Sequence, residues 1–202
     1  MDKIIVTINR QFCSGGNYIG KKISEKLNVP YYDKELVNLA AKQAGYADAT
    51  FEKVDEVATN SLLYSLIMGV HNSTQTSILP DNDKLFNIQA DIIRNAAKEG
   101  SAVVLGRCSN YILREEKPLV RVFLKADMDF RIARYERLYG APEKGTVESA
   151  IEKRDKKRAS YFKFYTGQRW EDIENYDLVI NTAKIGVDDA VDMIIDYINK
   201  IK

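Results

Sequence analysis

The chain has 202 residues, of which 45% are hydrophobic and 29% carry a charge. This length and composition are typical of one globular domain with a buried core, or of one domain that carries a small insertion. The net charge is +1, so the composition argues against a general polynucleotide-binding or membrane-binding surface. No apolar run is long enough to span a membrane and no leader precedes the first strand pattern, so we expect a cytoplasmic protein.

The sequence is poor in residues that form disulfides or bind transition metals. It holds two cysteines, Cys13 and Cys108, and one histidine, His71. We do not expect a structural disulfide in a reducing compartment, although both cysteines follow predicted strands and can lie near each other. With one histidine and no C-x-x-C pair, a zinc site is not expected, and we assign no protein ligand for a metal.

The stretch over residues 4–27 predicts a phosphate-binding loop. Residues 4–8 form an apolar, β-branched run that is typical of a buried parallel strand. Apolar residues at spacings of four predict a helix over residues 18–27. Between them lie Gly15 and Gly16, and the amides at the start of such a helix favour an anion. The candidate phosphate ligands are Ser14, Gly15, Gly16, Asn17 and Tyr18.

This loop departs from the G-x-x-x-x-G-K-[ST] pattern of phosphate-binding loops. Gly15 matches the second glycine of the pattern. Arg10 stands at the first glycine, Gly16 at the lysine, and Asn17 at the serine or threonine. The loop alone therefore leaves two interpretations open, a phosphate site or an ordinary turn between a strand and a helix.

The rest of the chain alternates between strand and helix patterns. Further strands are predicted at residues 31–32, 102–105, 119–124 and 178–180. Helices are predicted at residues 34–44, 83–98, 110–113 and 127–138, after Thr146, and at residues 188–201. The alternation predicts an α/β fold with a five-stranded parallel sheet and helices on both faces. Ligands in such sheets bind beyond the carboxyl ends of the strands.

Residues 46–85 break this alternation. They hold clusters of Ser, Thr and Asn, a helix-like run over residues 62–68 and a Leu-Pro-Asp-Asn breaker, with no strand pattern. We expect a helical insertion that moves against the core, within a single domain over residues 1–202.

Two groups of arginines can bind anions at the carboxyl edge. Arg107 follows a buried strand, where it can be a surface residue or a phosphate clamp, because a guanidinium binds phosphate bidentately. Residues 153–158 hold five cations beside Asp155, and for the lysines a solvated helix face is expected. Arg154 and Arg158 share a helix face and can neutralise charge on a transferring phosphoryl group. The aromatic residues 161–165 can pack in the core or stack on a base, and we expect packing.

Four motifs in this order resemble the cytidylate kinases. Residues 4–33, from the first strand and Ser-Gly loop to Val-Pro-Tyr-Tyr-Asp, resemble the opening of that family. Residues 106–107 resemble its Gly-Arg-Asp, and residues 154–159 resemble its lid motif Arg-Asp-x-x-Arg-Ala. Residues 176–187 resemble its C-terminal part. The loop over residues 10–16 and Thr-Gly-Gln at residues 166–168 are more similar to the divergent cytidylate kinase-like proteins.

The resemblance implies a nucleoside monophosphate kinase fold of the P-loop type. Residues 46–85 would be the monophosphate-binding insertion, and about residues 141–170 would be the lid. The implied reaction is transfer of a phosphoryl group from ATP, with Mg²⁺, to a nucleoside monophosphate, with CMP or dCMP as first candidates. The implied acceptor-binding residues are Asp33, Lys34, Arg107, Asp155 and Arg158, of which Asp155 and Arg158 would read the cytosine ring.

Because the loop departs from the family pattern, both the residue that replaces the catalytic lysine and the activity itself are left open. Arg10, Lys21 or Lys22 can replace the missing lysine, and Arg10 is the best placed because the lysines begin one turn inside the helix. The candidate catalytic residues are therefore Arg10, Arg154 and Arg158. The alternatives are a catalytically weak or inactive nucleotide-binding protein with a sensor or scaffold role, and a kinase with a changed acceptor. The oligomeric state is not indicated by the sequence.

Overall fold

The structure, a computed structural model, describes residues 3–34, 36–38 and 81–201. Five parallel strands form one sheet in the order β2-β3-β1-β4-β5, which confirms the predicted sheet. The strands are β1 (Ile5–Arg10), β2 (Tyr31–Tyr32), β3 (Ala102–Leu105), β4 (Leu119–Lys125) and β5 (Leu178–Asn181). β2 and β3 lie on one side of β1, and β4 and β5 lie on the other. The crevice at the carboxyl end of β1 is therefore the position where ligands bind in open parallel sheets.

The helices alternate with these strands along the chain. They are α1 (Gly16–Leu27), α4 (Asp81–Glu99), α5 (Ser109–Ile112), α6 (Met128–Tyr139), α7 (Val147–Thr166), α8 (Thr182–Ile185) and α9 (Val187–Lys200), with a short 3₁₀ turn at Ile173–Asn175. A helical turn follows Asp33, whose Oδ1 accepts the Leu36 amide at 3.0 Å, as expected of an N-cap. Residues 39–80, which include most of the predicted insertion, lie outside the described residues.

α7 is one continuous helix through the basic and the aromatic segments. A capping box between Thr146 and Ser149 starts it, and Gly167, at a φ of 72°, ends it in the left-handed conformation. Of the aromatic residues, Phe162 is buried in the core, and the Tyr165 ring stacks on Phe86 of α4 with centroids 3.9 Å apart. Tyr161, Phe162 and Tyr165 therefore pack as expected, whereas Phe164 is exposed.

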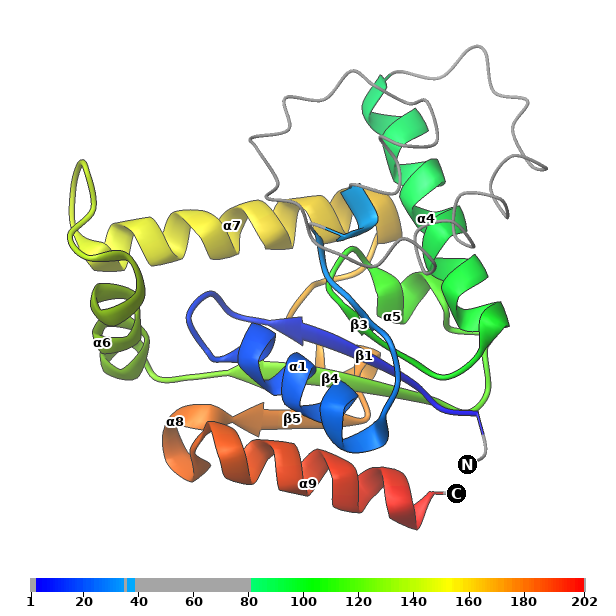
Figure 1. Cartoon of the computed structure of the whole chain (residues 1–202). Helices are drawn as coiled ribbons and strands as arrows, with labels where there is room; N and C mark the ends of the chain where they lie inside the picture. Colours follow the sequence, from blue (N-terminus) through cyan, green and yellow to red (C-terminus); the bar gives the residue numbers. More distant parts are fainter. Residues whose placement is uncertain (1–2, 35, 39–80, 202) are drawn as a thin grey trace.

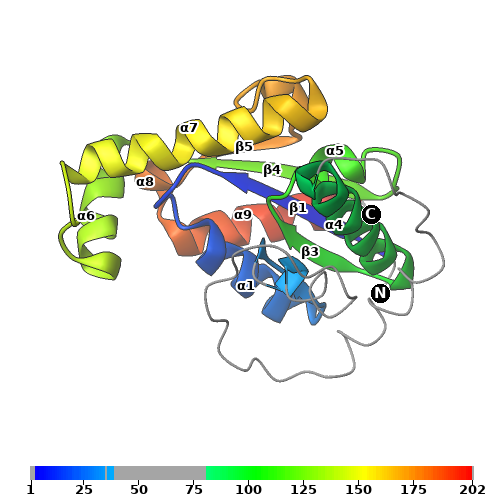
Figure 2. The same cartoon turned by 90° about the horizontal axis from the view of Figure 1, so that it is seen from above.

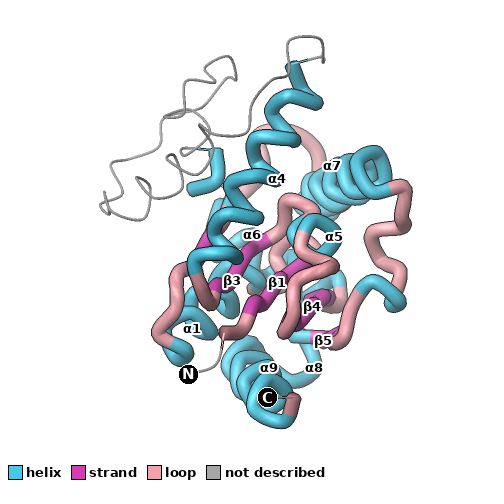
Figure 3. Tube along the Cα trace, turned by 90° about the vertical axis from the view of Figure 1, so that its right-hand side faces the viewer, coloured by secondary structure: helices cyan, strands magenta, loops and turns pink. Residues whose placement is uncertain are grey.

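The sheet lies between two layers of helices, which Figures 1, 2 and 3 show from three directions. Side chains of a strand alternate between the two faces, so Val6 and Ile8 pack with α1 and α9, while Ile5 packs with α4, α5 and α7. α6 lies beyond the sheet, beside the first half of α7 (Figure 1). In the part of the chain that the structure describes, no helix combines the length and the apolar character needed to cross a membrane.

Candidate functional site

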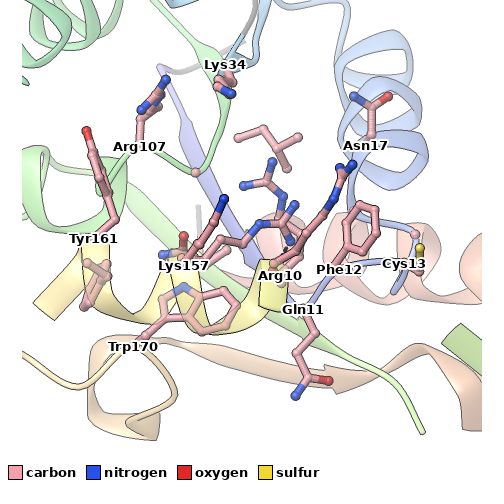
Figure 4. A pocket seen from close by; sticks show the side chains of 18 of the residues that line it. Arg10, Gln11, Phe12, Cys13, Asn17, Lys34, Arg107, Lys157, Tyr161 and Trp170 are labelled. Atoms are coloured by element: carbon pink, nitrogen blue, oxygen red, sulfur yellow. Dashed lines mark hydrogen bonds between the residues drawn. The ribbon is translucent and has the colours of Figure 1, made fainter. Parts of the chain in front are cut away.

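A cavity of about 820 Å³ opens at the carboxyl ends of β1 and β3 (Figure 4). Among the described residues that line it, seven are cationic and none is acidic. Dense positive charge in a concave site raises the local concentration of anions and favours a ligand with several negative charges. The cationic residues are Arg10, Lys34, Arg107, Arg134, Arg154, Lys157 and Arg158.

The turn between β1 and α1 presents free backbone donors to this cavity. In the described part of the chain, the amides of residues 15–18 donate no hydrogen bond, since they precede the first intrahelical bonds of α1. Gly15 adopts a φ of 93°, and a Cβ at that position would lie 2.7 Å from Cγ1 of Val187. Position 15 therefore requires glycine, and the turn leaves backbone donors of the kind that favour an anion at the start of a twelve-residue helix.

Ser14 has a structural role in this turn instead of a place on the cavity wall. Its side chain is buried, its Oγ donates to the Gln11 carbonyl at 2.9 Å, and its amide donates to the same carbonyl at 3.3 Å. Thr182 at the start of α8 donates to the Ser14 carbonyl at 2.8 Å. Of the candidate phosphate ligands, Gly15, Gly16, Asn17 and Tyr18 line the cavity, whereas Ser14 closes the turn behind them.

Arg10 extends from the start of α1 to the end of β3. A Cβ added to Gly16 would lie 2.6 Å from Cγ of Arg10, and a Cβ added to Gly106 would overlap Nη1 of Arg10. Both glycines therefore make room for one arginine side chain, which crosses the cavity between the α1 amides and Arg107 (Figure 4). The carbonyl of Arg10 accepts a hydrogen bond from Nη1 of Arg158 at 2.9 Å.

Arg107 lies at the opposite end of the cavity from Asn17 (Figure 4). Its backbone is left-handed, with a φ of 55°, and its Nη2 donates to Oδ1 of Asn38 at 3.0 Å. Its guanidinium carbon lies 5.5 Å from the centroid of the Tyr161 ring. Nε of Arg107 is buried and has no hydrogen-bond partner among the described residues. Lys34 lines the same end of the cavity.

Asn38 and Gln89 hold Arg107 in place, and the sequence interpretation did not include them. Nε2 of Gln89 donates to Oδ1 of Asn38 at 2.8 Å, and the Tyr161 hydroxyl donates to Oε1 of Gln89 at 3.3 Å. Burial raises the pKa of Tyr161 to about 12, although the nearby Arg107 acts in the opposite direction, so this hydroxyl remains a donor at neutral pH. The sequence signal for this pair was Gln89, a polar residue between the apolar Ile88 and Ala90. In the structure Gln89 is only 1% exposed.

The basic segment of α7 forms another wall. The guanidinium carbons of Arg154 and Arg158 lie 4.4 and 5.4 Å from the centroid of the Phe12 ring, so these two arginines share one surface, as predicted. Burial lowers the pKa of Arg158, whereas Arg154 is exposed. Lys157, expected only on a solvated face, is exposed and also lines the cavity.

Two predicted acceptor ligands do not line the cavity in this structure. The carboxylate of Asp33 caps a helix, and both carboxylate oxygens of Asp155 accept hydrogen bonds from the protein, from the Phe12 amide and from Arg131. The structure therefore brings together Lys34, Arg107, Arg154 and Arg158 from their separate motifs, and leaves Asp33 and Asp155 outside. Arg134, Leu138 and Tyr139 of α6 complete the wall near Phe12, and the sequence interpretation had given them no role.

Cys13 and Cys108 both line the cavity and both are buried free thiols. Burial raises the pKa of each thiol, that of Cys108 to about 12. The thiolate is the reactive form of cysteine, so neither residue has the properties of a nucleophile at neutral pH.

The sequence is similar to cytidylate kinases over most of its length. The profile of the cytidylate kinase-like family matches residues 5–184. A cytidylate kinase from Pyrobaculum aerophilum is 26% identical over 196 residues, which cover 96% of this chain and 92% of that relative.

Solved structures agree on the fold. An uncharacterized protein from Eubacterium ventriosum is 28% identical and has a TM-score of 0.72, with 98% of this chain and 99% of that chain covered. A shikimate kinase from Bacteroides thetaiotaomicron is 12% identical, has a TM-score of 0.56 over 97% of this chain and 98% of that chain, and shows the fold alone. The fold is that of P-loop kinases, and the family profile covers both the α1 loop and the basic helix α7. The chain therefore belongs to the cytidylate kinase-like family.

Proposed function

We propose that this protein transfers the γ-phosphoryl group of ATP to a nucleoside monophosphate, with CMP or dCMP as the first candidates. The observation that carries the proposal is the set of seven cationic residues, with no acidic one among the described lining residues, on the cavity wall between the free amides of α1 and Arg107. A phosphate donor and a phosphorylated acceptor bring several negative charges together in such a reaction. Family membership and the kinase fold support a phosphotransferase, and the name of the relative supports the cytidine acceptor.

The donor phosphates fit the α1 end of the cavity. Amides of residues 15–18 would bind the phosphate oxygens, aided by the helix dipole. Arg10 would take the place of the missing lysine, since its side chain occupies the space beside Gly16. A guanidinium can contact two phosphate oxygens at once, whereas an ammonium acts as a point charge.

Mg²⁺ could bind at this end of the cavity if the phosphates supplied most of its ligands. In the described part of the chain, no group of three or more His, Cys, Asp or Glu side chains could hold a metal. Asn17 is exposed on the wall, and its amide oxygen is the kind of ligand that Mg²⁺ accepts. When bound, the ion would neutralise phosphate charge, and Asn17 would orient it.

The acceptor phosphate fits the opposite end, at Arg107 and Lys34. An oxygen of the acceptor phosphate would attack the γ-phosphorus, and the bond from that phosphorus to the oxygen bridging to the β-phosphate would break. ADP leaves with the bond electrons, and the acceptor becomes a nucleoside diphosphate. Arg10, Arg154 and Arg158 would stabilise the charge on the transferring group.

A coupled assay of ADP release with CMP, dCMP, UMP and AMP tests the proposal. We expect CMP or dCMP to raise ADP release well above the rate without acceptor, and Arg107→Ala to raise the acceptor KM. Gly16 at the lysine position favours a second candidate, a nucleotide-binding protein without transfer activity. That candidate predicts ATP binding with no acceptor-dependent ADP release, a result that would contradict the kinase proposal.

A further inference from the structure

Asp155 of α7 is bound to the loop that follows β1. Its Oδ1 accepts the Phe12 amide at 2.6 Å, and its Oδ2 accepts Nη1 of Arg131 on α6. The Asp155 side chain is 15% exposed and does not line the cavity. Both oxygens therefore have protein donors in the conformation that the structure describes.

Arg131 contacts the carbonyl of the same residue, Phe12. Its side chain is 6% exposed, and its Nη1 also donates to the Phe12 carbonyl at 3.4 Å. Its Nη2 contacts the sulfur of Met128 at 3.7 Å. The ion pair of Asp155 and Arg131 thus holds the backbone of Phe12 through both its amide and its carbonyl.

An apolar cluster surrounds this ion pair. Phe12 and Cys13 of the loop pack with Tyr135 of α6 and Ile151 of α7, and Ile151 is fully buried. Ile151 lies four residues before Asp155, so both face the loop from one side of α7. In partly desolvated surroundings an ion pair is costly to break, because the remaining charge loses its partner.

Phe12 links this ion pair to the cavity. It lies two residues after Arg10 and three before Gly15. The guanidinium groups of Arg154 and Arg158 lie over its ring in cation–π contact. A fixed Phe12 backbone therefore fixes the amide loop and also the surface on which both arginines rest.

We propose that Asp155 is a positioning residue that holds the phosphate-binding loop, and that it does not read the base of the acceptor. The proposal rests on the proposed function for its kinetic consequences, but the contact itself is independent of turnover. It assigns to Asp155 a different role from the one that the lid motif implies. It also makes α6, α7 and the loop after β1 one connected unit.

Asp155→Asn tests the role, because it removes the ion pair with Arg131 and leaves a neutral oxygen in place of the carboxylate that accepts the Phe12 N–H. We expect the Phe12 amide to exchange its hydrogen at least tenfold faster, and the Kd for tripolyphosphate, a probe of the amide loop, to rise at least fivefold. The ATP KM should rise, while the acceptor KM and the ratio of kcat/KM for CMP over UMP should stay within twofold. Glu152→Gln, which removes the same charge from the exposed side of α7, should leave all of these values unchanged.

Arg131→Lys provides a second variant that keeps the charge but loses the guanidinium whose Nη1 bridges Asp155 and the Phe12 carbonyl. It should accelerate Phe12 exchange and weaken tripolyphosphate binding in the same way, also where Asp155→Asn does not fold. Unchanged Phe12 exchange together with a changed CMP over UMP ratio would overturn the proposal and return Asp155 to base recognition. If the protein transfers no phosphoryl group to any acceptor, hydrogen exchange and tripolyphosphate binding still decide the role of Asp155, so the two failures are distinct.

Discussion

Arg10 and Gly16 are packed so closely that position 16 has no room for a side chain: a Cβ there would lie 2.6 Å from Cγ and 2.9 Å from Cβ of Arg10. Position 16 is where the phosphate-loop pattern has its lysine. We propose that Arg10 replaces this lysine, because a residue without a side chain at position 16 accommodates the side chain that comes from position 10. The same side chain also requires glycine at position 106.

This packing predicts that restoring the pattern lysine harms the protein. Gly16→Lys should lower kcat/KM by about a hundredfold, because the new side chain displaces Arg10, and Arg10→Ala should lower kcat by at least a similar factor. The double variant should recover part of the loss, since the lysine then enters the vacated space. Steady-state ADP release measures all three. Gly100→Lys is the matched control, as a Cβ on Gly100 meets no atom within 4 Å. A Gly16→Lys variant with wild-type or higher activity would show that Arg10 does not occupy the lysine site.

Arg154 and Arg158 should differ in their effects on stability. Arg154 is exposed, so Arg154→Ala should lower kcat by roughly a hundredfold and leave Tm within about one degree. Arg158 is half-buried and donates to the Arg10 carbonyl, so Arg158→Ala should lower kcat and also destabilise the fold by about 1–2 kcal/mol. Differential scanning fluorimetry beside the kinetics separates the two. Equal Tm values for both variants would show that the Arg158 contact contributes no stability.

The hydrogen bond from Arg107 to Asn38 should affect the binding of the acceptor and not that of ATP. Asn38→Ala removes the oxygen that accepts from Arg107 and from Gln89, so the Arg107 guanidinium loses its orientation. We expect the acceptor KM to rise about tenfold with the ATP KM nearly unchanged, since each hydrogen bond to a charged group contributes about 1.5–3 kcal/mol. Asn199→Ala, on the exposed side of α9, is the control. A rise confined to the ATP KM would place Arg107 at the donor instead.

Cys108 should make the fold less stable at alkaline pH. Burial raises its pKa from 9.0 to about 12, so between these values the unfolded thiol loses its proton while the folded one keeps it. The unfolded state then binds fewer protons, and the free energy of unfolding falls as the pH rises from about 9 towards 12. At pH 10.5 the loss is on the order of 2 kcal/mol. Urea unfolding of the wild type and of Cys108→Ala at pH 8 and pH 10.5 separates the loss of stability caused by Cys108 from the loss caused by the titration of tyrosines. A parallel loss in both proteins would contradict it.

The sequence was sufficient for features that depend on local patterns. The β-branched run over residues 4–8 and the apolar run over residues 102–105 predict buried strands, and the alternation of elements predicts the sheet. Thr146 as a cap and the shared face of Arg154 and Arg158 depend on helical spacing, which is also local. Each of these appears in the structure.

The contacts between distant segments could not be predicted in this way. The partner of Asp155 is Arg131 on another helix, and nothing in the motif around Asp155 indicates that its carboxylate turns to the loop. The fit of Arg10 against Gly106 depends on the pairing of β1 with β3. Residues 46–80 of the predicted insertion lie outside the described part of the chain, so that expectation stays a prediction.

Phosphorus NMR of the purified protein with ATP, Mg²⁺ and CMP tests the central claim most directly, because it identifies where the γ-phosphoryl group goes. The account predicts that the γ-phosphate signal of ATP declines while ADP and CDP appear in equal amounts, without accumulation of inorganic phosphate. The Arg10→Ala variant should show the same products at a rate at least a hundredfold lower. Formation of ADP with an equal amount of inorganic phosphate and unchanged CMP, or no change in any signal, would contradict the account.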